Sequence, residues 1–447
     1  MKFRKFGKAL LMSALSLGAV FSVTSCVQSY TVGFLYVTGL QTGSSSSGTG
    51  IISGFKIDHN TGQLTEIHGL PIASGGQNPE RAVLLTGSRF LYVLNKGTDA
   101  CVTDQPCKAT ANIVQFAVGG NGVLSQQGTF YTQGYNPFRL IADSTGSHLY
   151  VLDHDAPSSA ACAQVLGAGV TSCGDVTGFS IDTNTGRLST MQNAQASANG
   201  QQLSYFPVPA NPIDFVLSNS FVLTLSGTPA TGDSVFPYAY ALANGQLTIS
   251  QNTSQPLNIG NATAIQTGGN SGNLYVLDND PITIAGGSSS FPAGTYAAQI
   301  LPYTVGTGGS LQAQTGGAVP DTGAGSQPLF IWFEAGQSNK WAYVANFGTN
   351  SNTNISQSSI AGYDIDTTTH QLTNMPQSPF GTGAGPRCLV EDPSNNFLYT
   401  ANFNDSTVTG HTLDHNEGVL KALNGKANKS YSLPGPATYC VIDGRTS

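Results

Sequence analysis

The chain has 447 residues, of which only 9% are charged and 39% are hydrophobic, and its net charge is −7. Clustered Lys and Arg recruit nucleic acids and anionic lipid headgroups, so this balance argues against nucleic-acid partners and against charge-driven membrane binding. Low charge can accompany disorder, but here the apolar residues fall in short β-rich runs, which indicates a packed protein.

The first 25 residues are typical of an export signal, because four basic residues precede an apolar run at residues 9–23 that is too short to span a membrane comfortably. Val23-Thr24-Ser25-Cys26 then resembles the lipobox of bacterial lipoproteins, in which the cysteine thiol carries a diacylglycerol. We therefore expect an exported, lipid-anchored protein of the cell envelope. The residue after Cys26 is not Asp, which favours the outer membrane or the periplasmic side. The alternative is an ordinary secretory signal that is cut nearby.

The mature chain is more acidic than the whole. Residues 1–25 hold four of the 17 basic residues, which leaves 13 against 24 acidic residues, a net charge of −11. We expect residues 26–32 to be a short tether and residues 33–447 to fold. Contact with the membrane is then expected through the lipid anchor alone.

Six further cysteines form an even set in an exported chain, which predicts disulfides rather than free thiols. Six cysteines allow 15 connectivities, and proximity favours two local pairs, Cys101 with Cys107 and Cys162 with Cys173. No Cys-x-x-Cys occurs, so a zinc site is not expected, and we predict no metal and no cofactor. The remaining two are Cys388 and Cys440.

An aromatic and aliphatic strand of the Leu-Tyr-Val type recurs at a mean spacing of about 60 residues. Its seven copies lie at residues 34–37, 90–93, 148–151, 221–224, 273–276, 341–344 and 397–400. The repeated Tyr and Phe side chains are expected in the core between repeats.

A second strand and a tight turn follow each copy. The clearest example runs from Gly54 to Asp58 and on through Thr61-Gly62-Gln63-Leu64. The other copies centre on Phe116, Phe179, Tyr240, Tyr303, Tyr363 and His411. Gly in these turns supplies the positive φ that a tight hairpin needs.

A third element begins at a proline or its equivalent upstream of six of the first strands. Proline is acceptable at the first residue of a strand, so these residues mark strand starts. They are Pro79, Pro137, Pro212, Thr263, Pro328 and Pro386. A seventh such segment, from Pro436 to Ile442, ends the chain, whereas the first Leu-Tyr-Val strand has no such segment before it.

The two incomplete ends complement each other, so the sequence predicts an all-β, seven-bladed β-propeller with four antiparallel strands per blade. The ring closes by pairing of the C-terminal strand with the N-terminal blade, which hides the exposed edges of an open array. This pairing also sets Cys440 in the inner strand next to that of Cys388, which favours a closing disulfide.

These motifs together resemble the lactonase family of seven-bladed propellers, which includes 6-phosphogluconolactonase-type hydrolases and a carboxymuconate lactonizing enzyme. The resemblance implies a site at one mouth of the channel, where His, Arg and acidic side chains project from the starts of inner strands. The family's Gly-Pro-His type motif stands here as Gly385-Pro386-Arg387. No Pro is followed by His, which is a departure from the family.

The blade pattern brings the starts of the inner strands and the ends of the Leu-Tyr-Val strands to one face. We expect this binding face to gather Glu80, Arg81, Asn95, Asp155, Asp214, Asp278, Asp280 and Asn402, with Lys96 beside them. Long loops on the same face, at residues 150–179 and 275–303, are of a kind that often serves binding.

Lactone hydrolysis needs a base that activates water and a cation that holds the developing oxyanion. Arg139 with Asp153 and His154 forms the best local set of candidate catalytic residues, and Arg387 is the further candidate. The alternative is that Asp153-His154-Asp155 is a structural turn whose carboxylates cap backbone amides. A calcium site there would lack the EF-hand pattern.

Two functions follow. The favoured one is a binding lipoprotein whose loop-bearing face takes a small molecule, a glycan or a protein. The alternative is an extracytoplasmic lactone hydrolase that acts on an unphosphorylated lactone, because phosphorylated sugar lactones are cytosolic. We expect a monomer. The remaining histidines are predicted to be structural: His59, His68, His148, His370, His411 and His415.

Overall fold

The structure is a computed structural model. It describes residues 30–42, 48–85, 89–98, 110–198, 200–218, 220–227, 232–249, 254–269, 272–323, 327–336, 339–348, 357–423 and 430–444. The export signal, the lipobox with Cys26 and most of the tether therefore lie outside the described residues. Within the folded unit, β1 begins at Thr31, two residues before the expected start.

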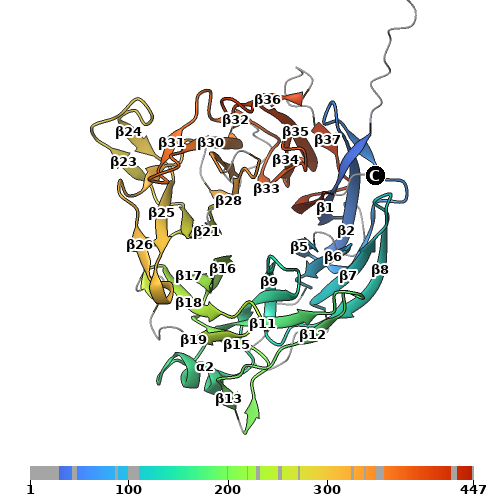
Figure 1. Ribbon diagram of the computed structural model, residues 1–447, viewed down its shortest axis with the longest axis vertical. Helices are drawn as coiled ribbons and strands as arrows, with labels where there is room; N and C mark the ends of the chain where they lie inside the picture. The colour runs from blue at the N-terminus through green and yellow to red at the C-terminus, as the bar shows by residue number, and fades with distance from the viewer. Residues whose placement is uncertain are drawn as a thin grey trace, which may run out of the picture. The chain divides into compact units, whose positions relative to one another are not determined.

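Residues 31–447 form one compact unit that contains seven antiparallel sheets arranged as a ring of blades (Figure 1). In each blade the strands pair in order from the channel outward. Blade 1 comprises β5 (Pro79–Leu85), β6 (Phe90–Asn95), β7 (Asn112–Val118) and β8 (Leu124–Phe130). Blade 2 comprises β9 (Tyr135–Ala142), β10 (His148–Asp155), β11 (Gly174–Ile181), β12 (Leu188–Thr190) and β15 (Phe206–Val208). Blade 3 comprises β16 (Pro212–Ser218), β17 (Phe221–Ser226), β18 (Ser234–Tyr240), β19 (Leu247–Ile249) and β20 (Gln255–Pro256).

The second half of the ring repeats this pattern. Blade 4 comprises β21 (Ala262–Thr267), β22 (Asn273–Asp278), β25 (Gln299–Val305), β26 (Leu311–Ala313) and β27 (Val319–Pro320). Blade 5 comprises β28 (Pro328–Phe333), β29 (Trp341–Asn346), β30 (Ser359–Ile365), β31 (Leu372–Asn374) and β32 (Phe380–Gly381). Blade 6 comprises β33 (Pro386–Glu391), β34 (Phe397–Asn402), β35 (Thr407–Leu413), β36 (Leu420–Ala422) and β37 (Ser430–Ser432). In all blades except blade 1 the fourth strand is split into two short pieces that pair with the same third strand.

The two ends of the chain build blade 7. Its strands are β38 (Ala437–Asp443), β1 (Thr31–Leu40), β2 (Thr49–Asp58), β3 (Leu64–Glu66) and β4 (Ile72–Gln77). β38 pairs with β1, with Tyr36 opposite Val441. The predicted seven blades and the predicted closure are therefore confirmed, and β38 contacts the inner strands of both neighbouring blades, β33 and β5.

The two repeated motifs bind each other across the blade boundaries. The Tyr of a Leu-Tyr-Val strand donates its hydroxyl to the backbone carbonyl of the turn glycine in the following blade. Tyr343 does so to Gly418 at 2.6 Å, and Tyr150 to Gly245 at 2.6 Å. The same bond joins Tyr36 to Gly122, Tyr92 to Gly186 and Tyr399 to Gly62, and Tyr275 uses the carbonyl of His370. The strand repeat and the turn repeat therefore form one contact between neighbouring blades, which we call the seam.

Blade 3 differs at this seam because Leu223 occupies the position of the tyrosine. The turn glycine of the next blade, Gly309, lies against Pro237 and Phe221 instead. Apolar packing alone therefore replaces the hydroxyl bond at the junction of blades 3 and 4.

Each inner strand has a register shift near its start that leaves one residue without a cross-strand partner. In β5 the shift falls between Pro79 and Arg81, and in β33 between Pro386 and Cys388. A bulge of this kind turns the extra residue away from the ladder. The seven bulged residues are Glu80, Phe138, Ile213, Thr263, Leu329, Arg387 and Thr438.

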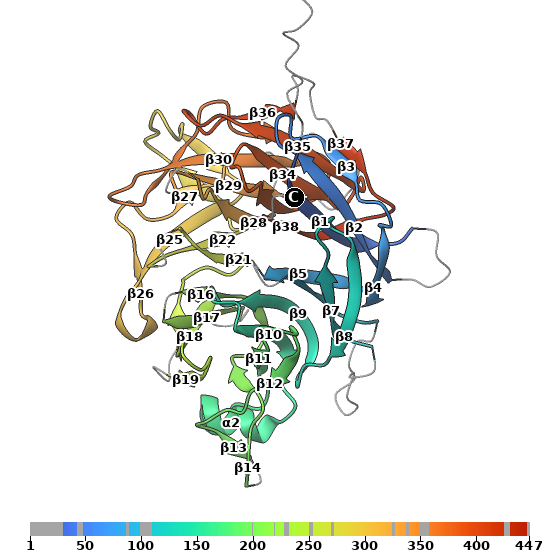
Figure 2. The same cartoon turned by 45° about the vertical axis from the view of Figure 1, so that its right-hand side comes forward.

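One insertion contains a helix that the sequence did not predict. α2 (Ser159–Leu166) interrupts the long loop between β10 and β11, and Ser158 caps its first turn. The disulfide Cys162–Cys173 ties it to the start of β11, and a small apolar cluster of Ala161, Ala196, Leu203 and Tyr205 packs there. The short hairpin β13 (Ser197–Ala198) with β14 (Gln201–Gln202) lies beside α2 (Figure 2), and a second hairpin pairs β23 (Ile282–Ile284) with β24 (Gly294–Tyr296). A 3₁₀ turn, η2 (Thr307–Gly309), precedes β26.

Candidate functional site

A cavity of about 760 Å³ opens at one mouth of the channel. We call it the mouth pocket. Four of the seven bulged residues line it, and they come from blades 6, 7, 1 and 2. Its lining residues are Leu40, Asn78, Pro79, Glu80, Lys96, Gly97, Thr98, Asn136, Phe138, Arg139, His154, Arg387, Phe403 and Thr438.

Arg139 is held in place by three contacts. Its Nε donates to Asp214 Oδ1 at 2.9 Å, and a terminal nitrogen donates to the carbonyl oxygen of Phe138 at 3.2 Å. Its guanidinium also lies over the Phe138 ring, 5.1 Å from the centroid. The ion pair with Asp214 fixes one edge of the guanidinium.

Arg387 reaches the same pocket with a different environment. Its guanidinium lies 4.0 Å from the centroid of Phe403 and 5.5 Å from that of Phe347. Among the described residues its buried Nε has no hydrogen-bond partner. Burial lowers the pKa of Arg387, an effect that Glu80 opposes and Arg139 adds to. Two aromatic rings therefore hold this cation, without an ion pair in the described part of the chain.

His154 is the histidine of the pocket. It lies near the end of β10, its side chain is 46% exposed, and its Nδ1 lies 3.1 Å from Asp155 Oδ1. When Nδ1 carries the proton and donates it to Asp155, Nε2 is left as an acceptor. Asp153 lies opposite Pro137, so the end of β10 that carries His154 lies beside the start of β9.

Below the mouth, Arg81 lines a narrower part of the channel. Its guanidinium lies 4.7 Å from the centroid of Tyr439 and donates to the carbonyl of Glu80 at 3.0 Å. Burial and the charge of Arg139 lower its pKa to about 10. Arg81, Arg139, Asp214 and Tyr439 share a second cavity of about 70 Å³.

The side chains that line the mouth pocket include more cations than carboxylates although the chain is acidic, and one of these cations, Arg139, is paired with Asp214. Lys96, Arg139 and Arg387 line it against a single carboxylate, that of Glu80. The net charge of the chain is a global count and did not predict this local excess. Phe138, Phe403 and Thr438 were not singled out from the sequence either, although Phe138 directly follows Pro137, and Thr438 lies two residues after Pro436.

Eight predicted residues do not line the mouth pocket, and four of these are buried within the blades. Asn95, Asp153, Asp278 and Asn402 are each fully buried, with 0% exposure. Asn95, Asp278 and Asn402 end the second strand of their blades, and Asp153 lies two residues before the end of β10. The side chains of all four lie buried within the blades. Their predicted place on the exposed binding face is therefore corrected. Of the other four, Arg81 and Asp214 line the second cavity, Asp155 pairs with His154, and Asp280 accepts from the backbone N–H of Gly260 at 3.0 Å.

The same blade position carries matched polar pairs in other blades. Asn95 lies opposite Asn112 and donates to its Oδ1 at 2.9 Å, and Gln299 donates to Asp278 at 2.7 Å. Blade 2 instead sets Asp153 directly opposite Asp175, and both are fully buried.

Burial raises the pKa of Asp153 to about 8, although hydroxyl donors from Thr132 and Thr177 oppose this rise. The Thr177 hydroxyl lies 3.1 Å from Asp153 Oδ2. Asp153 therefore belongs to a buried structural pair rather than to the pocket.

The remaining predictions concern the disulfides and the structural histidines. The disulfides Cys162–Cys173 and Cys388–Cys440 are present, whereas Cys101 and Cys107 lie outside the described residues. His148 pairs with Asp143 at 2.8 Å, and His411 lies 2.8 Å from the carbonyl of Gly381, in keeping with structural roles.

The described residues contain no cluster of three or more His, Cys, Asp or Glu residues suited to a metal ion. Over the same part of the chain, no helix has the length and apolar character needed to cross a bilayer.

Fold and pocket together define a seven-bladed β-propeller with a charged site at the mouth of its channel. The family model described as "Lactonase, 7-bladed beta-propeller" matches residues 333–441. The likeness to the lactonase family that the motifs indicated is thereby confirmed. No curated protein matches the chain.

Several solved structures share this fold. A candidate 6-phosphogluconolactonase from Bacteroides uniformis has 14% sequence identity and a TM-score of 0.62, over 92% of this chain and 99% of that one. The periplasmic gluconolactonase PpgL of Pseudomonas aeruginosa has 16% identity and a TM-score of 0.61, over the same shares. A protein from Lactobacillus plantarum has 17% identity and a TM-score of 0.59, over 93% and 99%. At these identities the likeness concerns the fold.

Proposed function

We propose that the protein is an extracytoplasmic lactone hydrolase and that the mouth pocket is its active site. The observation that carries this proposal is the meeting of His154, oriented by Asp155, with the cations Arg139 and Arg387 in one cavity. Two of the similar propellers are described as gluconolactonases, which supports the same class of reaction. The basic and apolar run at residues 1–25 supports export, and the motif at Cys26 supports a lipid anchor.

In the proposed mechanism His154 is the general base. Its Nε2 takes a proton from water while the water oxygen attacks the lactone carbonyl carbon, and Asp155 stabilises the imidazolium that forms. The carbonyl oxygen gains negative charge, which the guanidinium groups of Arg139 and Arg387 stabilise. The ester C–O bond then breaks, the ring oxygen takes the proton back from His154, and the product is a hydroxy acid.

The pocket also bears on the choice of substrate. Arg139 is paired with Asp214, but Lys96 and Arg387 line the pocket against the carboxylate of Glu80, which favours a ligand with negative charge. Export separates the protein from phosphorylated sugar lactones in the cytosol. We therefore propose an unphosphorylated lactone, with preference for one that carries a carboxylate. Glu80 is placed to accept hydrogen bonds from the ring hydroxyls of such a substrate.

The test is hydrolysis of three lactones by the purified mature chain, followed by proton release: a neutral sugar lactone, one with a carboxylate and one with a phosphate. We expect turnover above the uncatalysed rate, greatest with the carboxylate. His154→Asn should lower kcat by about 10²-fold or more, since general bases contribute 10²–10⁴-fold. The exposed and distant His415→Asn is the matched control and should be unaffected. Absence of turnover for all three lactones would overturn the proposal.

A second candidate function is binding of a glycan or a protein without turnover. The observation that favours it is the projection around α2, which the disulfide Cys162–Cys173 and its own apolar cluster hold together. Deletion of residues 156–175 should then abolish capture of a glycan from an array. If lactone hydrolysis survives this deletion, the two functions are separate.

A further inference from the structure

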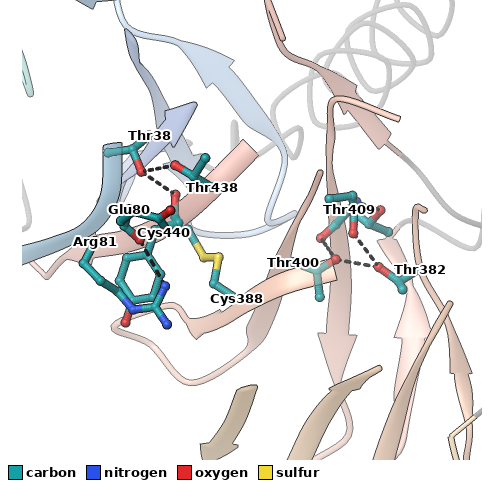
Figure 3. Close-up of a disulfide and its surroundings, with 11 residues drawn as sticks. Thr38, Glu80, Arg81, Thr382, Cys388, Thr400, Thr409, Thr438 and Cys440 are labelled. Atoms are coloured by element: carbon teal, nitrogen blue, oxygen red, sulfur yellow. Dashed lines mark hydrogen bonds between the residues drawn. A yellow bond between two sulfur atoms is a disulfide. The ribbon is translucent and has the colours of Figure 1, made fainter. Parts of the chain in front are cut away.

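The disulfide Cys388–Cys440 joins two inner strands, β33 of blade 6 and β38 of blade 7 (Figure 3). Backbone pairing keeps each of these strands within its own blade, so they meet at the channel through side chains. Both cysteines are buried, with 0% and 3% exposure. The bond is therefore a covalent link across a boundary that has no sheet hydrogen bonds.

Each cysteine stands beside residues of the mouth pocket. Arg387 directly precedes Cys388 and is the bulged residue of β33. On the other strand, Thr438 lines the pocket, and Tyr439 carries the guanidinium of Arg81. The hydroxyls of Thr438 and Thr38 lie 3.0 Å apart, which holds that wall to β1. The disulfide thus connects the strand of Arg387 to the adjacent strand that carries Thr438 in the wall of the same cavity.

The position of Arg387 depends on a link between β33 and β38 more than the position of Arg139 does. As a bulged residue it has no cross-strand partner in β34, and its guanidinium contacts aromatic rings rather than hydrogen-bond acceptors in the described chain. Arg139, by contrast, is fixed by its ion pair with Asp214. Ring contacts leave a guanidinium free to slide, so the position of the Arg387 backbone decides where its charge lies.

We propose that the Cys388–Cys440 disulfide positions Arg387 in the mouth pocket. Without this bond, β33 and β38 separate at the bulge and the guanidinium of Arg387 leaves the place where it meets the substrate. The consequence for substrate binding rests on the proposed hydrolase function, whereas the placement of Arg387 does not. The disulfide Cys162–Cys173 is the natural control, since no residue next to either of its cysteines lines the pocket, whereas Arg387 directly precedes Cys388.

The first experiment compares kinetics. Cys388→Ala with Cys440→Ala should raise KM about tenfold and change kcat less, and Arg387→Gln should do the same. Combining all three substitutions should add no further loss, because both changes act on one group. Cys162→Ala with Cys173→Ala should leave KM unchanged. Additive losses would overturn the proposal.

The second experiment does not depend on turnover. Phenylglyoxal modifies accessible arginines, and mass spectrometry reports the rate at Arg387 with the exposed Arg187 as internal reference. Loss of the Cys388–Cys440 bond should change the Arg387 rate at least threefold relative to Arg187. An unchanged rate in a folded variant means a purely structural bond and would refute the positioning role. If Arg387 responds but the wild type cleaves no lactone, the hydrolase proposal fails and the positioning role stands.

Because two alanines could leave a cavity that unfolds the ring, Cys388→Val with Cys440→Ala is a volume-filling alternative. Its melting curve shows whether the blades remain folded before either readout is taken. A folded variant with wild-type KM and wild-type labelling at Arg387 contradicts the proposal.

Discussion

The buried pair Asp153 and Asp175 gives the sharpest quantitative prediction. Asp153→Asn should stabilise the protein near neutral pH, because other blades use asparagine at this position and Asn95 there bonds to Asn112 across the strand. An asparagine at 153 can donate to Asp175 in the same register. The substitution removes a carboxyl group that must stay protonated in the fold.

The expected size follows from the pKa. Asp153 titrates at about 8 in the fold and at an ordinary value of 3.8 when unfolded. As the pH rises from 3.8, the unfolded chain loses its proton freely while the folded chain keeps it, so stability falls. About three pH units between 3.8 and 7, at about 1.4 kcal/mol per unit, give a cost of about 4 kcal/mol at pH 7. The cost levels off above pH 8.

The measurement is urea unfolding from pH 4 to pH 8.5. The gain in unfolding free energy from Asp153→Asn should be near zero at pH 4 and grow with pH. The reverse change, Asn95→Asp in blade 1, should bring the same pH-dependent penalty to a position that now lacks it. A gain that does not vary with pH would refute the reasoning. Stabilisation of the wild type by Ca²⁺ that Asp153→Asn abolishes would show that a cation, rather than a proton, neutralises the pair.

Three further predictions concern the seam, the site and the anchor. Tyr343→Phe removes the buried hydroxyl that donates to Gly418 and should lower the free energy of unfolding in urea by about 1–3 kcal/mol. Tyr131→Phe, at a ring that is 51% exposed, should lower it by almost nothing. Equal losses would contradict a stabilising role for the tyrosine–glycine bond between blades. Arg139→Lys keeps the charge but cannot reach both Asp214 and the Phe138 carbonyl, so kcat/KM for a cleaved lactone should fall about tenfold, and an unchanged value would remove Arg139 from the site. Cys26→Ser should release the protein from the membrane fraction and abolish palmitate labelling, and membrane retention would contradict lipidation.

The sequence determined the architecture because a propeller is built from local repeats. The Leu-Tyr-Val strands, the glycine turns and the prolines each report on a short segment, and the unmatched ends near Tyr36 and Pro436 required a closed ring. The reason for the repeated Tyr and Gly was not visible in any one segment. They are partners across blades, with Tyr399 donating to Gly62 from the far end of the chain.

The tertiary structure alone decided which polar residues form the site. Asp153 and His154 are adjacent in sequence, yet alternation along β10 buries the first between strands and turns the second into the pocket. Arg387 and Glu80 meet only because blades 6 and 1 flank the closing strand β38. Charge in the pocket is a property of that geometry, so an acidic chain presents a mouth lined by more cations than carboxylates, and no count along the sequence predicts it.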